Sequence, residues 1–120
     1  MKLVVQLPES DALRAWIDPS MRLATCGLAR TEVVRAVMGD GEAIYARARD
    51  LIRRLDVIAL DDSLLDVAAL LEPSSMQTLE AIHVAAALAL DDDLLAFVAY
   101  DRRLVVAAEA LGLPTASPGL

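Results

Sequence analysis

The chain has 120 residues, a length that predicts a single domain over residues 1–120 with enough chain to bury a core. Hydrophobic residues make up 57% of it and aromatic residues only 3%, so that core must consist of Leu, Val, Ile and Ala. The net charge of −7 argues against a protein that holds nucleic acid by bulk positive charge alone. It still allows a nuclease in which a metal ion and a few arginines supply positive charge locally.

The sequence contains no membrane or secretion signal. No apolar run reaches the roughly 18 residues that a membrane-spanning helix needs, and no signal-peptide pattern opens the chain. The single cysteine, Cys26, excludes an internal disulfide framework and fits a reducing compartment. We therefore expect a cytoplasmic protein that has no membrane partner.

The first half of the chain predicts helices separated by short strands. Ser10 is the expected N-cap of the first helix, and Gly39-Asp40-Gly41 ends the second. The predicted helices cover residues 10–17, 28–38 and 42–55, and the predicted strands cover 23–26 and 57–60.

The second half continues the same alternation. Asp61 or Asp62 can cap a helix, and Ser74 with Gln77 has the spacing of a capping box for a long one. Gly112 is a natural C-cap for the last helix. The predicted helices cover residues 63–71, about 74–90 and 102–111, and the predicted strands cover 94–100 and 114–116. Strands that alternate with helices predict an α/β domain with a parallel sheet and helices on both faces.

Three acidic residues stand where apolar positions or strand ends are expected. Asp101 follows a predicted strand directly, and Glu32 lies early in the helix that follows the strand ending near Cys26. Glu80 lies near the start of its own helix, on the face shared with Val84 and with residue 87. Because ligands bind at the carboxyl ends of parallel strands, we expect the three carboxylates to converge there.

Carboxylates that lie close together repel one another unless a cation neutralises them. Mg²⁺, or alternatively Mn²⁺, prefers such oxygen ligands and keeps several waters. A bound divalent cation can activate water and stabilise charge on a scissile phosphate. The sequence thus predicts metal-assisted hydrolysis of a phosphodiester at Glu32, Glu80 and Asp101.

The chain resembles the PIN-domain proteins, and among them the VapC-type ribonuclease toxins of bacterial toxin–antitoxin pairs. The resemblance spans almost the whole chain. The matching segments are residues 8–13 (PESDAL), 28–33 (LARTEV), 79–88 (LEAIHVAAAL), 100–104 (YDRRL) and 110–114 (ALGLP). The resemblance implies a three-layer α/β/α sandwich, a Mg²⁺-dependent endoribonuclease acting on RNA, a homodimer and a VapB-like antitoxin. It also implies that Glu32, Glu80 and Asp101 occupy three of the family's four acidic metal-binding positions.

The chain departs from the family pattern at three points. The family's first strand, with its metal-binding Asp, is missing, because residues 1–5 resemble the helix that follows that strand. The family prefers Asp where Glu80 stands, and it often has Ser or Thr where Ala99 stands. A start site placed too late, a truncation or a genuinely degenerate member would each explain the first departure. The alternative function is therefore a catalytically impaired PIN-like protein that only binds an antitoxin or RNA.

Structural explanations compete with the functional ones at several of these residues. Asp101 can act simply as the N-cap of the following helix, and Glu32 can pair with a neighbouring arginine. Arg102 and Arg103 could hold a phosphate bidentately or could be surface cations. The arginines in residues 47–54 are typical of a solvated helix face, although a subset could contact RNA.

Overall fold

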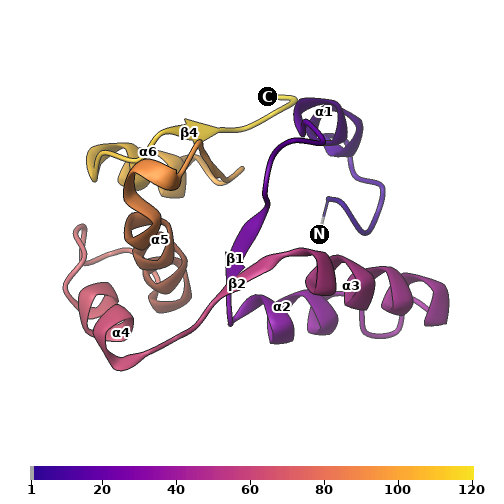
Figure 1. Cartoon of the computed structure of the whole chain (residues 1–120), viewed down its shortest axis with the longest axis horizontal. Helices are drawn as coiled ribbons and strands as arrows, with labels where there is room; N and C mark the ends of the chain where they lie inside the picture. The colour runs from indigo at the N-terminus through magenta and orange to yellow at the C-terminus, as the bar shows by residue number, and fades with distance from the viewer. Residues whose placement is uncertain (1) are drawn as a thin grey trace. The chain divides into compact units, whose positions relative to one another are not determined.

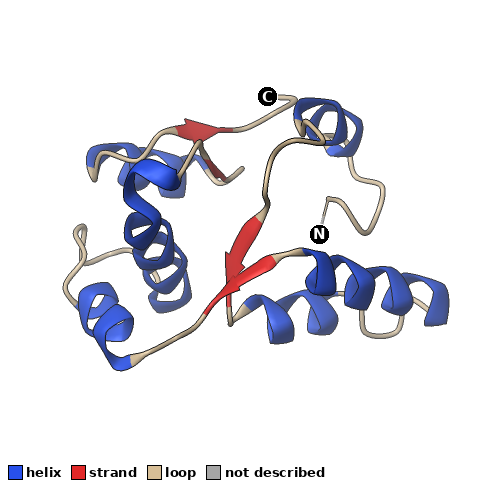
Figure 2. Ribbon diagram, in the orientation of Figure 1, coloured by secondary structure: helices blue, strands red, loops and turns tan. Residues whose placement is uncertain are grey.

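The computed structural model describes residues 2–120 and divides the chain into two compact units. Unit 1 contains the residues up to Ile58 together with Pro118–Leu120, and unit 2 contains Ala59–Ser117. Both units combine helices with short parallel strands, as Figure 2 shows by colour. The fold is therefore a helix-rich α/β arrangement, and we describe each unit by itself.

Unit 1 is organised around one parallel pair of strands. Its elements are α1 (Ser10–Trp16), β1 (Ala24–Cys26), α2 (Ala29–Ala36), α3 (Glu42–Arg54) and β2 (Asp56–Ile58). In the ladder, Ala24 lies opposite Asp56 and Cys26 lies opposite Ile58. Arg22, just before β1, forms a bidentate ion pair with Asp56, with N···O distances of 3.0 and 3.1 Å. This pair lies at the start of the ladder, next to the Ala24–Asp56 position. All four boundaries predicted for α2 and α3 agree with the structure within two residues.

The core of unit 1 lies between α2 and α3 and the N-terminal segment (Figure 1). Val4, Val37 and Ala48 are almost fully buried. The partly buried residues around them are Val5, Val33, Ile44 and Leu51. On α3 the apolar positions follow the spacing i, i+4, i+7, which places them on one face of the helix.

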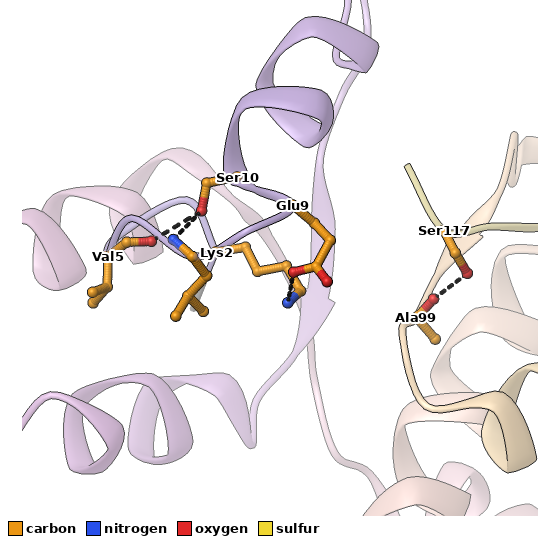
Figure 3. Close-up of polar contacts among 7 residues, drawn as sticks. Lys2, Val5, Glu9, Ser10, Ala99 and Ser117 are labelled. Atoms are coloured by element: carbon orange, nitrogen blue, oxygen red, sulfur yellow. Dashed lines mark hydrogen bonds and ion pairs between the residues drawn. The ribbon is translucent and has the colours of Figure 1, made fainter. Parts of the chain in front are cut away.

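Ser10 has a different role from the one that the sequence predicted. It is the first residue of α1, and Glu9 takes the N-cap position without a side-chain cap bond. The Ser10 hydroxyl is buried, donates to the carbonyl of Val5 (3.1 Å) and accepts from the N–H of Leu7 (2.8 Å; Figure 3). The hydroxyl therefore holds the preceding turn, where backbone groups need partners.

Lys2 joins this N-terminal turn to α1. Its ammonium forms an ion pair with the Glu9 carboxylate at 2.8 Å (Figure 3). The hydrogen bond from Lys2 is the main reason that the pKa of Glu9 lies below its usual value. Residues 2–4 form turns, so the helix that family resemblance suggests at this position is not present in the part that the structure describes.

Unit 2 contains the second parallel pair of strands, in which Phe97 lies opposite Thr115 and Val98 opposite Ala116. Its elements are α4 (Asp62–Ala69), α5 (Thr78–Leu90), the 3-10 turn η1 (Asp91–Asp93), β3 (Phe97–Val98), α6 (Arg102–Ala110) and β4 (Thr115–Ala116). The predicted cap of α4 is confirmed, because the Asp61 carboxylate accepts from the N–H of Leu64 at 2.8 Å.

The core of unit 2 is built from small and branched aliphatic residues of α5, α6 and the turn that follows α6. Val84, Ala87, Ala108 and Leu113 are buried together. The end of α6 is a Schellman motif, in which Gly112 donates to the carbonyl of Glu109 (2.9 Å) and Leu113 to that of Ala108 (3.1 Å). The motif turns the chain so that Leu113 enters the core directly before β4.

Two elements of unit 2 differ from the prediction at a boundary by more than two residues. The helix expected from Ser74 begins at Thr78, because residues 73–76 form a turn in which Met76 donates to the carbonyl of Pro73 (3.0 Å). The strand expected over 94–100 shrinks to Phe97–Val98. The short partner β4 explains the second difference, since a ladder can extend only as far as its partner strand does.

The parallel pairing that the sequence predicts is confirmed in both units. Among residues 2–120, however, the strands form two separate two-stranded sheets, β1-β2 and β3-β4 (Figure 2), and no single sheet joins the four. In the same residues, no helix combines the length and the apolar character needed to cross a bilayer.

Candidate active site

Glu80 lies in the first turn of α5 and holds the start of that helix. Its carboxylate oxygen Oε1 accepts a hydrogen bond from the backbone N–H of Gln77 at 3.4 Å. This is the reciprocal bond of a capping box, in which Gln77 is the N-cap and Glu80 the third helical residue. A negative charge at this end of the helix is also favoured by the helix dipole. Glu80 thus has a structural role, whatever else it does.

Glu80 lines a small pocket of unit 2 together with residues of α6. The pocket has a volume of about 70 Å³, which is enough for a few waters or a small ion. Its polar lining consists of Ser75, Glu80 and Arg103. The remaining lining residues are Pro73, Met76, Leu104 and Ala107. In residues 2–120, Glu80 and Arg103 form no ion pair within 4.0 Å, either with each other or with another side chain. A carboxylate and a guanidinium therefore share this pocket while both keep the capacity to bind a ligand.

Asp101 begins the helix that carries Arg103 into the pocket. Its oxygen Oδ1 accepts from the N–H of Arg103 (2.9 Å) and more weakly from that of Leu104 (3.4 Å). The structural role that the sequence offered for Asp101, the N-cap of α6, is thereby confirmed. The side chain is exposed. Oδ2 accepts none of the hydrogen bonds found in the described residues, so the cap leaves one oxygen for a further ligand.

Glu32 belongs to unit 1, where it lies in the first turn of α2 and is half-buried. Its charge acts on Cys26, the last residue of β1. Burial is the main cause that raises the pKa of the Cys26 thiol, and the Glu32 carboxylate raises it further, while a backbone hydrogen bond at Leu28 opposes both. Glu32 therefore lies close to the carboxyl end of β1, where the sequence predicted it.

The structure thus assigns Glu80 and Asp101 to unit 2 and Glu32 to unit 1. Within either unit, no three His, Cys, Asp or Glu side chains of the described residues form a group that could hold a metal ion. Carboxylate oxygens are nevertheless the ligands that Mg²⁺ takes, and Mg²⁺ uses only one or two of them when waters and a substrate phosphate complete its shell. The donors at Glu80 and Asp101 fit this chemistry.

Sequence reasoning missed Ser75 and Met76 as parts of the site. Both lie in the segment that was predicted to start the helix, and the turn over residues 73–76 brings them to the pocket instead. The Pro73-Ser74-Ser75 sequence does indicate a break in the chain, because such residues favour turns, but Ser74 was interpreted as the N-cap of the helix that follows.

Comparison with known proteins finds related ribonucleases. The chain is similar to three proteins of Mycobacterium tuberculosis: ribonuclease VapC46 (39% identity), ribonuclease VapC47 (37%) and ribonuclease VapC35 (34%). The alignments cover 98–99% of this chain and 90–91% of the relatives. No family model matches the sequence, and no solved structure is significantly similar to it. The similarity over nearly the full length shows that the chain belongs to the family of the VapC ribonucleases.

Proposed function

We propose that this protein is a Mg²⁺-dependent endoribonuclease, the toxin of a VapC-type toxin–antitoxin pair. The observation that carries the proposal is the similarity to three ribonucleases along almost the whole chain. The pocket of unit 2 supports it, because a carboxylate and an arginine both line this pocket, and this combination suits a phosphodiester substrate.

The metal ligands in this proposal are Glu32, Glu80 and Asp101, with Mg²⁺ as the metal and Mn²⁺ as a possible substitute. When bound, Mg²⁺ would activate a water and stabilise charge on the scissile phosphate. The free oxygen of Asp101 and the second oxygen of Glu80 are the donors available for it in unit 2. Their first oxygens hold helix ends, which fixes the direction of each carboxylate before any ligand arrives.

Arg103 has a separate role in the proposal. Its guanidinium can donate two parallel hydrogen bonds to non-bridging oxygens of a phosphate. Placed in the pocket beside Glu80, it would bind the phosphate while repelling cations from its own side of the pocket. Leu104 and Ala107 supply apolar lining of the same pocket.

The partners follow from the same family. We propose an RNA substrate, a VapB-like antitoxin that neutralises the enzyme, a homodimer and action in the cytoplasm. We also propose that the complete fold is the PIN-like three-layer sandwich.

A catalytically impaired protein that binds only an antitoxin or RNA is the alternative. One observation favours it: the capping bonds of Glu80 and Asp101 give both carboxylates a structural reason to be present without catalysis. The comparison of this chain with a version extended at its N-terminus by one strand distinguishes the two. Cleavage by the extended protein alone would mean that the missing acid is indispensable.

The decisive experiment measures Mg²⁺-dependent cleavage of single-stranded RNA by amide variants. Asp101→Asn and Glu80→Gln remove a charge but keep the cap, because Asn caps helices as well as Asp, and Gln can replace Glu in a capping box. We expect both variants to unfold at the same denaturant concentration as the wild type but to cleave at least tenfold more slowly. Asp61→Asn is the matched control, since Asp61 caps α4 and lies outside the proposed site.

Each outcome has a clear meaning. If the two amide variants cleave like the wild type and the Asp61 control, the carboxylates serve only as caps and the proposed site is wrong. If the wild type itself cleaves no RNA with Mg²⁺ or Mn²⁺, and the extended protein does not either, the binding-only alternative replaces the proposal.

A further inference from the structure

The positive charge of the chain is concentrated in unit 1. Nine of the 11 Lys and Arg residues lie before residue 59, together with eight acidic residues, which gives this part a net charge of +1. The sequence of unit 2 contains two arginines and ten acidic residues, a net charge of −8. A partner with many negative charges would therefore bind to unit 1 much more favourably than to unit 2.

Helix α3 carries the densest part of this positive charge on its exposed side. Its buried face consists of Ile44, Ala48 and Ile52, which follow the spacing i, i+4, i+8. Four arginines of the same helix are exposed, and they are Arg47, Arg49, Arg53 and Arg54. Because the buried face fixes the rotation of α3, the arginines must face solvent.

Three residues of α3 form a stripe that combines one aromatic ring with two positive charges. Tyr45, Arg49 and Arg53 are spaced i, i+4, i+8, so their side chains line one side of the helix. The Arg49 guanidinium lies 5.7 Å from the centre of the Tyr45 ring, within the range of a cation–π contact. Arg54 is paired with Asp50 at 3.0 Å, whereas Arg49 and Arg53 form no ion pair within the described residues.

We propose that the stripe of Tyr45, Arg49 and Arg53 is a binding surface for single-stranded RNA. The two arginines would contact successive phosphates, and the Tyr45 ring would stack on a base. An aromatic ring next to unpaired arginines is the combination that binds single strands without sequence preference. An acidic peptide would use the arginines but would gain little from the ring, so RNA fits the stripe better. The inference rests on the proposed function for its ligand, RNA.

The test measures binding of a fluorescent single-stranded oligouridine to the full chain by anisotropy, with a chelator present so that no RNA is cleaved. Arg53→Ala should weaken binding and reduce the slope of log K against log salt by about 0.7, the value for one phosphate contact with a single strand. Arg54→Ala removes the same charge from the neighbouring position, which Asp50 already neutralises, and should leave affinity and slope nearly unchanged. Tyr45→Phe should bind like the wild type, whereas Tyr45→Ala should bind about fivefold more weakly or worse.

Equal effects of Arg53→Ala and Arg54→Ala would overturn the inference, because they would reflect net charge alone. If a glutamate-rich peptide competes with the oligouridine, and this competition requires Arg53 but not Tyr45, the result would point to a protein partner instead. The proposed function is tested separately, by cleavage in the Asp101 and Glu80 variants. If RNA cleavage depends on those acids but RNA binding is unchanged in the Arg53 and Tyr45 variants, only this inference is refuted.

Discussion

At the scale of single residues, the acidic side chains of unit 2 have two compatible roles. The sequence already suggested that Asp101 caps a helix, because an acid after a strand and before a helical pattern is a typical N-cap. It did not suggest the same for Glu80, since Ser74 offered a capping box of its own. In the structure both acids use one oxygen for a helix end. A carboxylate can therefore cap a helix and bind a metal ion at the same time, because it has two oxygens.

The pKa of the Cys26 thiol responds to the charge of Glu32, the candidate site residue in unit 1. The charge of Glu32 adds to burial in raising the thiol pKa, so Glu32→Gln should lower that pKa, although it should stay above the usual value of about 8.5. A titration of thiolate absorbance in the ultraviolet, with Cys26→Ala as the baseline, measures the shift. Glu9→Gln is the control, because Glu9 is paired with Lys2 and is not among the groups that affect the thiol.

The raised pKa of Cys26 also affects stability. A group whose pKa is higher in the folded state stabilises the fold below its unfolded pKa, and this contribution is lost as the pH rises toward the folded pKa. The free energy of unfolding should therefore fall above about pH 8.5 in the wild type and less steeply in Cys26→Ala. An identical thiol titration in the wild type and Glu32→Gln would mean that Glu32 lies too far from the end of β1 to act on it.

At the scale of elements, helix ends determine where the short strands can form. Helix α6 ends at a Schellman motif that needs a residue with positive φ, and Gly112 has a φ of +89°. The sequence allowed this C-cap to be predicted, because Gly after an apolar helical pattern is its usual signal. The length of β3 could not be predicted in the same way, since it depends on β4, which lies at the other end of α6.

Gly112→Ala tests the importance of this helix end. A methyl group at Gly112 would meet no atom within 4 Å, so the cost is the backbone strain alone, about 1 kcal/mol. Gly112→Asn should cost less, because Asn tolerates the left-handed conformation. Chemical denaturation measures both values. A cost for Ala no greater than that for Asn would show that the motif does not hold the α6–β4 connection.

At the scale of the whole molecule, the order of elements could be predicted and their long-range assembly could not. Alternating strands and helices indicated parallel pairing, and both pairs are parallel. Which strands become neighbours depends on contacts between distant residues, about which local patterns contain no information. The alternation therefore predicted one parallel sheet, whereas the described residues form two separate strand pairs. The pocket shows the same limit. Glu80 and Arg103 were both noted in the sequence, but only the packing of α5 and α6 brings them together.

The uneven charge of the chain leads to a prediction about metal binding. Unit 2 has a net charge of −8, and self-repulsion of this kind destabilises a compact state. Any salt should raise the melting temperature by screening, and Mg²⁺ should raise it further if the carboxylates bind the ion. A ligand that binds only the folded state adds about 2.7 kcal/mol when its concentration is one hundred times its Kd.

The melting temperature in MgCl₂ and in NaCl of the same ionic strength separates these two effects. We expect an excess stabilisation by Mg²⁺ in the wild type, which Glu80→Gln and Asp101→Asn reduce or abolish and which Asp61→Asn retains. The amide variants keep their helix caps, so the loss of the excess would reflect the loss of ligands and not of structure. If MgCl₂ stabilises the wild type no more than NaCl does, or if Asp61→Asn removes the excess as well, then Mg²⁺ acts on the general charge of the chain and Glu80 and Asp101 are not its ligands.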